Sequence, residues 1–146
     1  MAGCNPCDMV CKSPTTQAAV KRTRETGKEV AIIFDRKCKE VEYVEGDSTH
    51  IPLGNRAPPG LFHVHPSYHP VTRWLSWEDL GTAFGRDMDF ICSSNLHGDT
   101  QCMEISSDGK KLLGTIKKTD DAALVLKVLQ KLKMITTCEC KMEGGL

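Results

Sequence analysis

The stretch FHVHPSYHPVTRWLSWEDL, residues 62–80, gathers histidine, serine and aspartate side chains in an otherwise ordinary chain. Side chains two positions apart on a strand point the same way, so a strand at LFHVH would present His63 and His65 on one face. Ser76 and Asp79 are three positions apart, where SWEDLGTAF begins like a helix. The first turn of that helix could direct the Asp79 carboxylate towards the two imidazoles.

Two imidazoles, one carboxylate and an open position make up a common type of catalytic zinc site. The residues therefore predict a Zn²⁺ ion held by His63, His65 and Asp79. A structural explanation also fits the same pattern, because Ser76-x-x-Asp79 is close to a helix capping box. A His-x-His pair on a strand can also belong to a loose surface site. The residues alone leave both explanations open.

Composition narrows the class of protein. The chain has 146 residues, a formal net charge of zero and a pI near 6.9, which gives no electrostatic case for binding nucleic acid or an anionic membrane. It has no apolar run of the roughly 18 to 20 residues that a bilayer requires, and its first residues lack the pattern of a secretion signal. We expect a cytoplasmic protein with reduced thiols, whose eight cysteines do not form a disulfide framework.

Periodicity and turn residues predict an alternation of helices and strands. In chain order, we expect a helix over 15–27, strands over 29–35 and 38–46, a strand over 61–65, a helix over 76–84, strands over 89–94, 100–107 and 110–118, and a helix over 119–134. Thr15 or Thr16 would cap the first helix and Gly27 would end it. The last helix is expected to pack on the sheet through one apolar face: Ala122, Val125, Leu126, Leu129 and Leu132. This order indicates an α+β, or mixed α/β, single domain.

The motif also resembles that of a known family. HVHP (63–66) followed by SWED (76–79) is similar to the signature of the JAMM zinc metalloproteases, also called JAB1/MPN/Mov34 or MPN-plus, in which a glutamate precedes His-x-His-Pro and Ser-x-x-Asp. The resemblance implies a JAMM/MPN-like (cytidine-deaminase-like) fold, with a central mixed β-sheet flanked by helices. It also implies that His63, His65 and Asp79 are the zinc ligands.

The same resemblance implies two further catalytic residues. Ser76 would help to stabilise the oxyanion, and a glutamate upstream would act as the general base. Glu29, at the head of the apolar run VAIIF, occupies the matching place. The spacer before Ser76 is longer than is usual in the family, and Glu25, Glu40 and Glu42 are alternative bases.

By resemblance, the protein is a hydrolase, a metallo-isopeptidase or peptidase. Its substrate partner would be a ubiquitin-like modifier or sulfur-carrier protein, cleaved after a C-terminal Gly-Gly. The alternative is a non-catalytic JAMM-like binding module. Tyr68, Trp74 and Trp77 could line a groove for an extended peptide, or the two tryptophans could instead cover the core. His50 and His69 are expected to be solvated.

Cysteines gather near both ends of the sequence. The segments CNPCDMVC and CEC are predicted to hold a second Zn²⁺ or an iron–sulfur cluster, through Cys4, Cys7, Cys11, Cys138 and Cys140. Such a cluster would make an iron–sulfur or sulfur-handling protein a second possible class. Cys38, Cys92 and Cys102 lie in strand patterns and are expected to be buried and inert.

These observations divide the chain into three parts. Residues 1–14 are predicted to form a Cys-rich N-terminal arm, residues 15–135 the JAMM/MPN-like catalytic domain, and residues 136–146 a Cys-containing C-terminal tail. The sequence shows no internal repeat, and no linker segment is visible between these parts.

Overall fold

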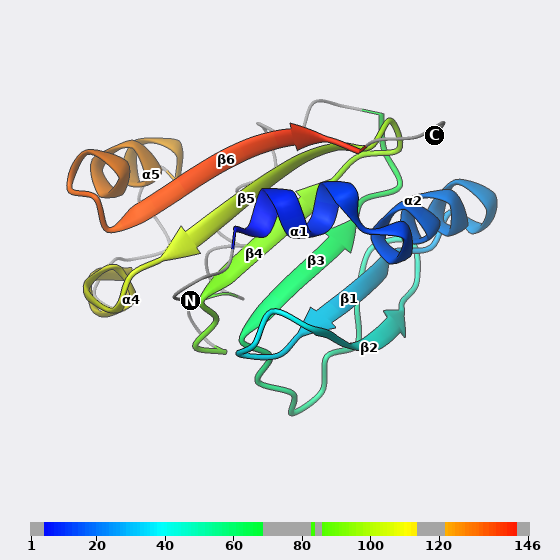
Figure 1. Cartoon of the computed structure of the whole chain (residues 1–146), viewed down its shortest axis with the longest axis horizontal. Coiled ribbons are helices and arrows are strands. Elements are labelled where there is room, and N and C mark those ends of the chain that lie inside the picture. The colour runs from blue at the N-terminus through cyan, green and yellow to red at the C-terminus, as the bar shows by residue number, and fades with distance from the viewer. Residues whose placement is uncertain (1–4, 69–82, 84–85, 114–121, 143–146) are drawn as a thin grey trace.

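The computed structural model describes residues 5–68, 83, 86–113 and 122–142 (Figure 1). Its elements are α1 (Pro6–Lys12), α2 (Pro14–Thr26), β1 (Val30–Phe34), β2 (Glu40–Glu45), β3 (Gly60–Val64), β4 (Phe90–Ser94), β5 (Asp99–Ile105), α4 (Ser107–Leu113), α5 (Ala122–Lys131) and β6 (Ile135–Lys141). Within the described residues the six strands form one sheet in the order β2-β1-β3-β4-β5-β6. Neighbouring strands are antiparallel except β3 and β4, which are parallel. The predicted mixed α+β class with a central mixed sheet is confirmed.

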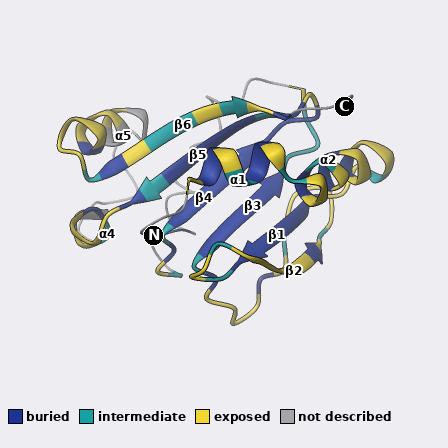
Figure 2. Cartoon of the chain, viewed as in Figure 1, coloured by how far each residue is buried: buried dark blue, intermediate teal, exposed yellow. Residues whose placement is uncertain are grey.

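The sheet has a core on each face. Helices α1 and α2 pack on one face, and Leu129 of α5 packs on the other beside Ile105 and Ile135. Strands β1, β3 and β4 are buried along their whole length (Figure 2). Strands covered on both faces have nearly continuous apolar sequences, which is why VAIIF and GLFHV show little alternation. His63 therefore lies in a strand that is covered on both faces.

Helix α1 occupies a segment that was expected to form an irregular arm. The Asn5 side chain caps it by accepting a hydrogen bond from Asp8 N at 3.3 Å, and Pro6 occupies the first turn, where its missing N–H costs nothing. Val10 and Cys11 are buried against the sheet. The residues of this segment thus contribute to the core.

Helix α2 confirms the first predicted helix, with a different cap. Ser13 Oγ accepts from Thr15 N at 3.2 Å and from Thr16 N at 3.5 Å, so Ser13 is the cap and the two threonines lie inside the helix. Gly27 ends the helix with a φ of 70°, and its N–H donates to Thr23 O at 2.8 Å. Glycine suits this left-handed position because it has no Cβ.

A close approach at the start of β3 explains another glycine. A Cβ on Gly60 would overlap the ring of Phe90, its partner on β4. That ring lies 5.6 Å from the ring of Phe34, measured between centroids, so it has little room to move away. The absence of a side chain at Gly60 therefore allows the aromatic cluster to form between β1 and β4.

The last third of the chain departs from prediction at two places. The strand expected over 110–118 is wrong for its described part, because Ser107–Leu113 form helix α4; residues 114–118 lie outside the described residues. Strand β6 was not predicted, and it pairs antiparallel with β5 where a tail was expected. Helix α5 confirms the last predicted helix, although Leu132, expected on its packed face, is exposed. No helix in the described part of the chain has the length and apolar character needed to cross a membrane.

Candidate metal centre

Glu29, His63 and His65 converge at one end of the paired strands β1 and β3. In that pairing Val30 lies opposite Val64, so the residues just beyond them, Glu29 and His65, continue the register. Glu29 Oε1 lies 3.4 Å from His65 Nδ1 and 3.8 Å from His63 Nδ1. One ligand atom from each of the three residues lies within 4.8 Å of the other two. Among the described residues, this group combines nitrogen and oxygen donors in the way a metal ion requires.

The group is largely buried. Glu29 is 4% exposed and His63 is 6% exposed, whereas His65 is partly open to solvent. A carboxylate that is buried this deeply needs compensating partners, and in the described part of the chain the two imidazoles lie beside it. Ser93 Oγ lies 2.6 Å from His63 Nε2, because β4 places Ser93 directly opposite His63. Sequence reasoning missed Ser93, since no motif marks it and its place depends on strand register.

The backbone of Glu29 is held on both sides by the loop that follows β2. Glu29 N donates to Asp47 O at 2.7 Å, and Gly46 N donates to Glu29 O at 2.8 Å. The Asp47 carboxylate accepts a hydrogen bond from Thr49 N at 2.8 Å, and this bond lowers the pKa of Asp47. The loop is therefore ordered around a charged Asp47 and fixes the strand end that carries Glu29.

A cavity of about 190 Å³ opens beside the three residues. Arg86 lines the cavity, and its Nη1 donates to Gly54 O at 2.9 Å and to Arg56 O at 2.6 Å, both in the loop between β2 and β3. His50, expected to be solvated, is exposed but also lines this cavity. The described lining residues are Glu29, Thr49, His50, Ile51, Leu53, Leu61, His63, His65, Arg86 and Ile91.

The competing glutamates lie elsewhere. Glu42 is exposed and pairs with Arg56 Nη2 at 2.6 Å, and Glu40 is exposed and accepts a hydrogen bond from Ser13 Oγ. Glu25 is exposed on α2. Of these four glutamates, all described, only Glu29 belongs to the group with the histidines.

Part of the predicted site lies outside the described residues. This applies to Ser76 and Asp79, whose roles stay predictions, and to His69, Trp74 and Trp77. Tyr68 is described: it is exposed, and its ring centroid lies 4.6 Å from that of His97. Of the predicted zinc ligands, the structure brings together His63 and His65.

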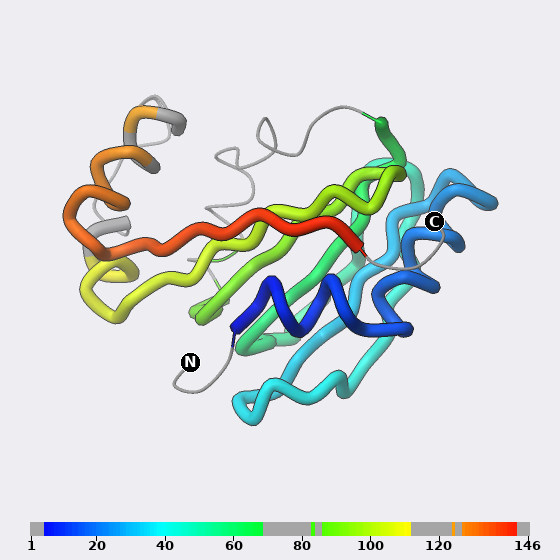
Figure 3. Tube along the Cα trace, turned by 45° about the horizontal axis from the view of Figure 1, so that its top comes forward, coloured from blue at the N-terminus to red at the C-terminus, as the bar shows by residue number. Residues whose placement is uncertain are grey.

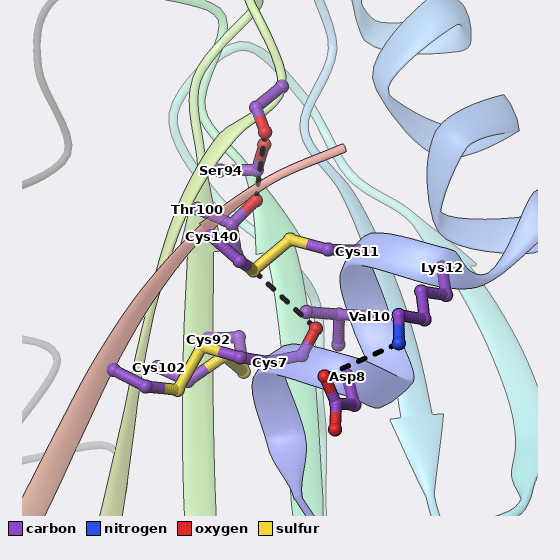
Figure 4. The surroundings of a disulfide bond; sticks show 12 residues. Cys7, Asp8, Val10, Cys11, Lys12, Cys92, Ser94, Thr100, Cys102 and Cys140 are labelled. Atoms are coloured by element: carbon purple, nitrogen blue, oxygen red, sulfur yellow. Dashed lines mark hydrogen bonds and ion pairs between the residues drawn. A yellow bond between two sulfur atoms is a disulfide. The ribbon is translucent and has the colours of Figure 1, made fainter. Parts of the chain in front are cut away.

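The cysteine predictions need correction. Cys7 is bonded to Cys138, and Cys11 is bonded to Cys140, as Figure 4 shows for the second pair. Four of the five residues predicted to hold a second zinc or an iron–sulfur cluster therefore form disulfides instead. Helix α1 packs beside β6 and brings each pair within bonding distance. The fifth residue, Cys4, lies outside the described residues.

The cysteines expected to be inert are also oxidised. Cys92 and Cys102 are buried, as predicted, but form a disulfide across β4 and β5, and Cys38 is disulfide-bonded too. The expectation of reduced thiols is therefore wrong for the described cysteines. The cytoplasmic location rested partly on that expectation and stays a prediction.

The chain matches no protein-family model, and no match is found among curated proteins or solved structures. What the fold and site define is a mixed α+β domain with a buried group of one carboxylate and two imidazoles. The case for a function therefore depends on the chemistry of these residues and on the motif that they belong to.

Proposed function

We propose that the protein is a zinc-dependent hydrolase of the JAMM type, a metallo-isopeptidase or peptidase. The observation that carries this proposal is the convergence of Glu29, His63 and His65, which are the described residues that the motif assigns to a base and to two zinc ligands. Imidazole nitrogens and carboxylate oxygens are ligands that zinc accepts. The donor set fits the ion.

His63 and His65 would hold the ion, together with Asp79. His63 Nε2 lies 2.6 Å from Ser93 Oγ, whereas His63 Nδ1 faces Glu29, so we assign Nδ1 as the nitrogen that would hold the ion. When bound, zinc would lower the pKa of a coordinated water to about 7 and polarise a substrate carbonyl.

Glu29 would act as the general base. Its buried carboxylate, 3.4 Å from His65 Nδ1, can take a proton from the attacking water and pass it to the leaving amine nitrogen as the C–N bond breaks. Ser76 would donate a hydrogen bond to the oxyanion, a type of contact whose loss costs about 10² to 10³ in rate.

The size of the cavity supports a slender substrate. Its volume of about 190 Å³ in the described part of the chain is below the roughly 300 to 1,000 Å³ of typical small-molecule sites. A segment of two glycines could enter such a narrow cavity, because glycine has no side chain. The small volume therefore favours the C-terminal Gly-Gly of a ubiquitin-like modifier or sulfur-carrier protein as the segment that is cleaved.

The metal assignment is tested by measuring zinc per chain, with the disulfides kept intact by non-reducing conditions, in the wild type, in His65→Ala and in His97→Ala. We expect the wild type and His97→Ala to carry zinc and His65→Ala to lose it, because His97 is exposed and outside the group. Equal zinc content in the wild type and His65→Ala would overturn the metal site.

The role of Glu29 is tested with Glu29→Gln and with Glu25→Gln as a matched control. The substrate is a ubiquitin-like or sulfur-carrier protein joined through its Gly-Gly terminus to a fluorogenic amine. We expect Glu29→Gln to retain zinc and to cleave about 10² to 10⁴ times more slowly than the wild type, with Glu25→Gln unaffected. Zinc binding without any cleavage by the wild type would favour the non-catalytic binding module.

A further inference from the structure

Three neighbouring strands bring cysteines into one row. In the pairing of β4 with β5, Cys92 lies opposite Cys102, and in the pairing of β5 with β6, Cys102 lies opposite Cys138. Directly paired residues point to the same face of a sheet. Helix α1 crosses this face and adds Cys7, which Figure 4 shows beside the bond between Cys92 and Cys102. Four cysteines from four elements thus meet in one place.

Sulfur atoms from two different disulfides are close together. Cys102 is bonded to Cys92, yet its sulfur, that of Cys7 and that of Cys138 all lie within 4.8 Å of one another. A tetrahedral zinc ion with Zn–S bonds of about 2.3 Å requires its sulfur ligands to be about 3.8 Å apart. Small side-chain rotations would therefore suffice to place the three sulfurs around one ion.

The group is shielded but has an opening. Cys7, Cys92 and Cys102 are buried, whereas Cys138 is partly exposed. Cys138 also lines a cavity of about 190 Å³, together with Asn5, Pro6, Glu104, Thr136 and Thr137. A small reductant or a metal ion can reach the sulfurs from this side.

We propose that Cys7, Cys92, Cys102 and Cys138 form a zinc–thiolate site that is created by reduction of their two disulfides. An external dithiol reduces each disulfide with two electrons and two protons and leaves as its own cyclic disulfide. Zn²⁺ then displaces the thiol protons of Cys7, Cys102 and Cys138. Cys92, released from Cys102 by the same reduction, is the nearest thiol for the fourth position. A disulfide oxidant reverses the process: it takes up the electrons, both disulfides re-form and the ion is released.

This ligand set differs from the one expected from sequence. Cys11 and Cys140 form a separate disulfide and are not members of the group within 4.8 Å. Cys92 and Cys102, expected to be inert, become ligands. The site lies on the face of the sheet covered by α1 and α2, opposite the face with Glu29 and the histidines, so it is independent of the proposed hydrolase activity.

The test uses the full chain with His63→Ala and His65→Ala, so that the first candidate site cannot contribute metal. The protein is freed of metal with a chelator, kept oxidised or treated with a phosphine reductant, and titrated with Co²⁺. Thiolate-to-cobalt charge-transfer absorption reports sulfur ligands. We expect one equivalent of Co²⁺ with strong charge-transfer bands for the reduced chain, displacement of Co²⁺ by Zn²⁺, and no such bands for the oxidised chain.

Matched variants identify the ligands. In the same background, Cys102→Ser should abolish the charge-transfer bands of the reduced chain, whereas Cys11→Ser should leave them intact. Reoxidation with a disulfide oxidant should release the ion, and circular dichroism follows the fold throughout. Equal losses in the two variants would overturn the proposal, as would a reduced chain that binds no ion, whether it stays folded or unfolds.

Discussion

His63 connects the sheet to the candidate site. It belongs to a fully buried strand, and its two ring nitrogens face different elements: Nδ1 lies 3.8 Å from Glu29 Oε1 and Nε2 lies 2.6 Å from Ser93 Oγ. A histidine whose second nitrogen is hydrogen-bonded has a defined tautomer and ring orientation, which favours metal binding by the first. Ser93 would therefore act on the metal through His63.

Replacing Ser93 by alanine should weaken zinc binding by about 10- to 100-fold without unfolding the protein. The hydroxyl removed is the hydrogen-bond partner of the imidazole, whereas the volume lost is small. Ser94→Ala is the control, because Ser94 is also buried but its hydroxyl donates to Asn95 O. Competition titrations with a zinc chelator measure both. Equal affinities for the two variants would contradict the role of Ser93.

The sequence was sufficient to predict site residues that lie close together along one segment of the chain. His63 and His65 are two apart on a strand, so their shared direction follows from the chain alone. Glu29 was assigned by resemblance, and the pairing of β1 with β3 brings it to the histidines. Ser93 could not be predicted in this way, because its contact depends on the parallel register of two strands that are not joined by a hairpin.

At the scale of elements, Lys110 fastens α4 to the turn before β4. Its Nζ lies 2.9 Å from Asp89 Oδ1 and 3.2 Å from Asp87 Oδ1. Partial burial acts to lower the pKa of Lys110, but hydrogen bonds to the two carboxylates outweigh this effect and raise the pKa above its ordinary value of 10.5. The charged lysine thus contributes to holding the helix in place.

Lys110→Met should lower the free energy of unfolding by about 1 kcal/mol at neutral pH. Since the folded pKa is raised, the contribution is fully present below the ordinary pKa of lysine and is lost as pH rises through the folded value. The difference between wild type and variant should therefore shrink in alkaline solution. Urea unfolding at neutral pH and in alkaline solution measures this difference in unfolding free energy. Lys111→Met is the control, because Lys111 is an exposed neighbour on α4. A difference that does not change with pH would contradict this account.

Short elements were the hardest to predict. Helices α1 and α4 have seven residues each, so neither offers more than two turns of periodicity. For α1 the Asn5-Pro6 start was a readable signal, although the neighbouring cysteines suggested metal ligands instead. The longer helices α2 and α5 were predicted because their residue patterns extend over enough positions. The buried strands were predicted because their apolar runs have few polar interruptions.

At the scale of the whole molecule, two disulfides join α1 to β6, elements from opposite ends of the chain that lie side by side (Figure 3). Cys7 and Cys138 are separated by 131 residues, and Cys11 and Cys140 by 129. Each bond alone would close nearly the entire chain into a loop. Once one bond is present, the other closes only a short loop through the few residues between Cys7 and Cys11 and between Cys138 and Cys140. The contributions of the two bonds to stability therefore overlap.

Removing either bond alone should lower the free energy of unfolding by about 2 kcal/mol. The two variants are Cys7→Ala with Cys138→Ala, and Cys11→Ala with Cys140→Ala. Removing both should cost about 4 to 5 kcal/mol more than removing one, because the long loop is then no longer closed. Urea unfolding of the three variants under non-reducing conditions measures these values. Two single losses that add up to the double loss would contradict the overlap.

The pairing of cysteines was beyond sequence reasoning for a physical reason. Spacing near the two termini suits metal ligands as well as disulfides, and the choice depends on which elements pack together. The partners follow only once α1 is placed beside β6. Burial of Cys92 and Cys102 was predictable from strand patterns, but their bond required the register of β4 with β5.

The long separation between bonded cysteines also affects the order of events during synthesis. A ribosome adding about 5 to 20 residues per second needs roughly 7 to 26 s to travel the 131 residues from Cys7 to Cys138. Throughout that interval Cys7 and Cys11 can meet only cysteines that are not their final partners. The N-terminal helix α1, made early, is therefore locked in place last, after β6 has emerged. A thiol–disulfide isomerase would speed the maturation of this chain by releasing the bonds that form too soon.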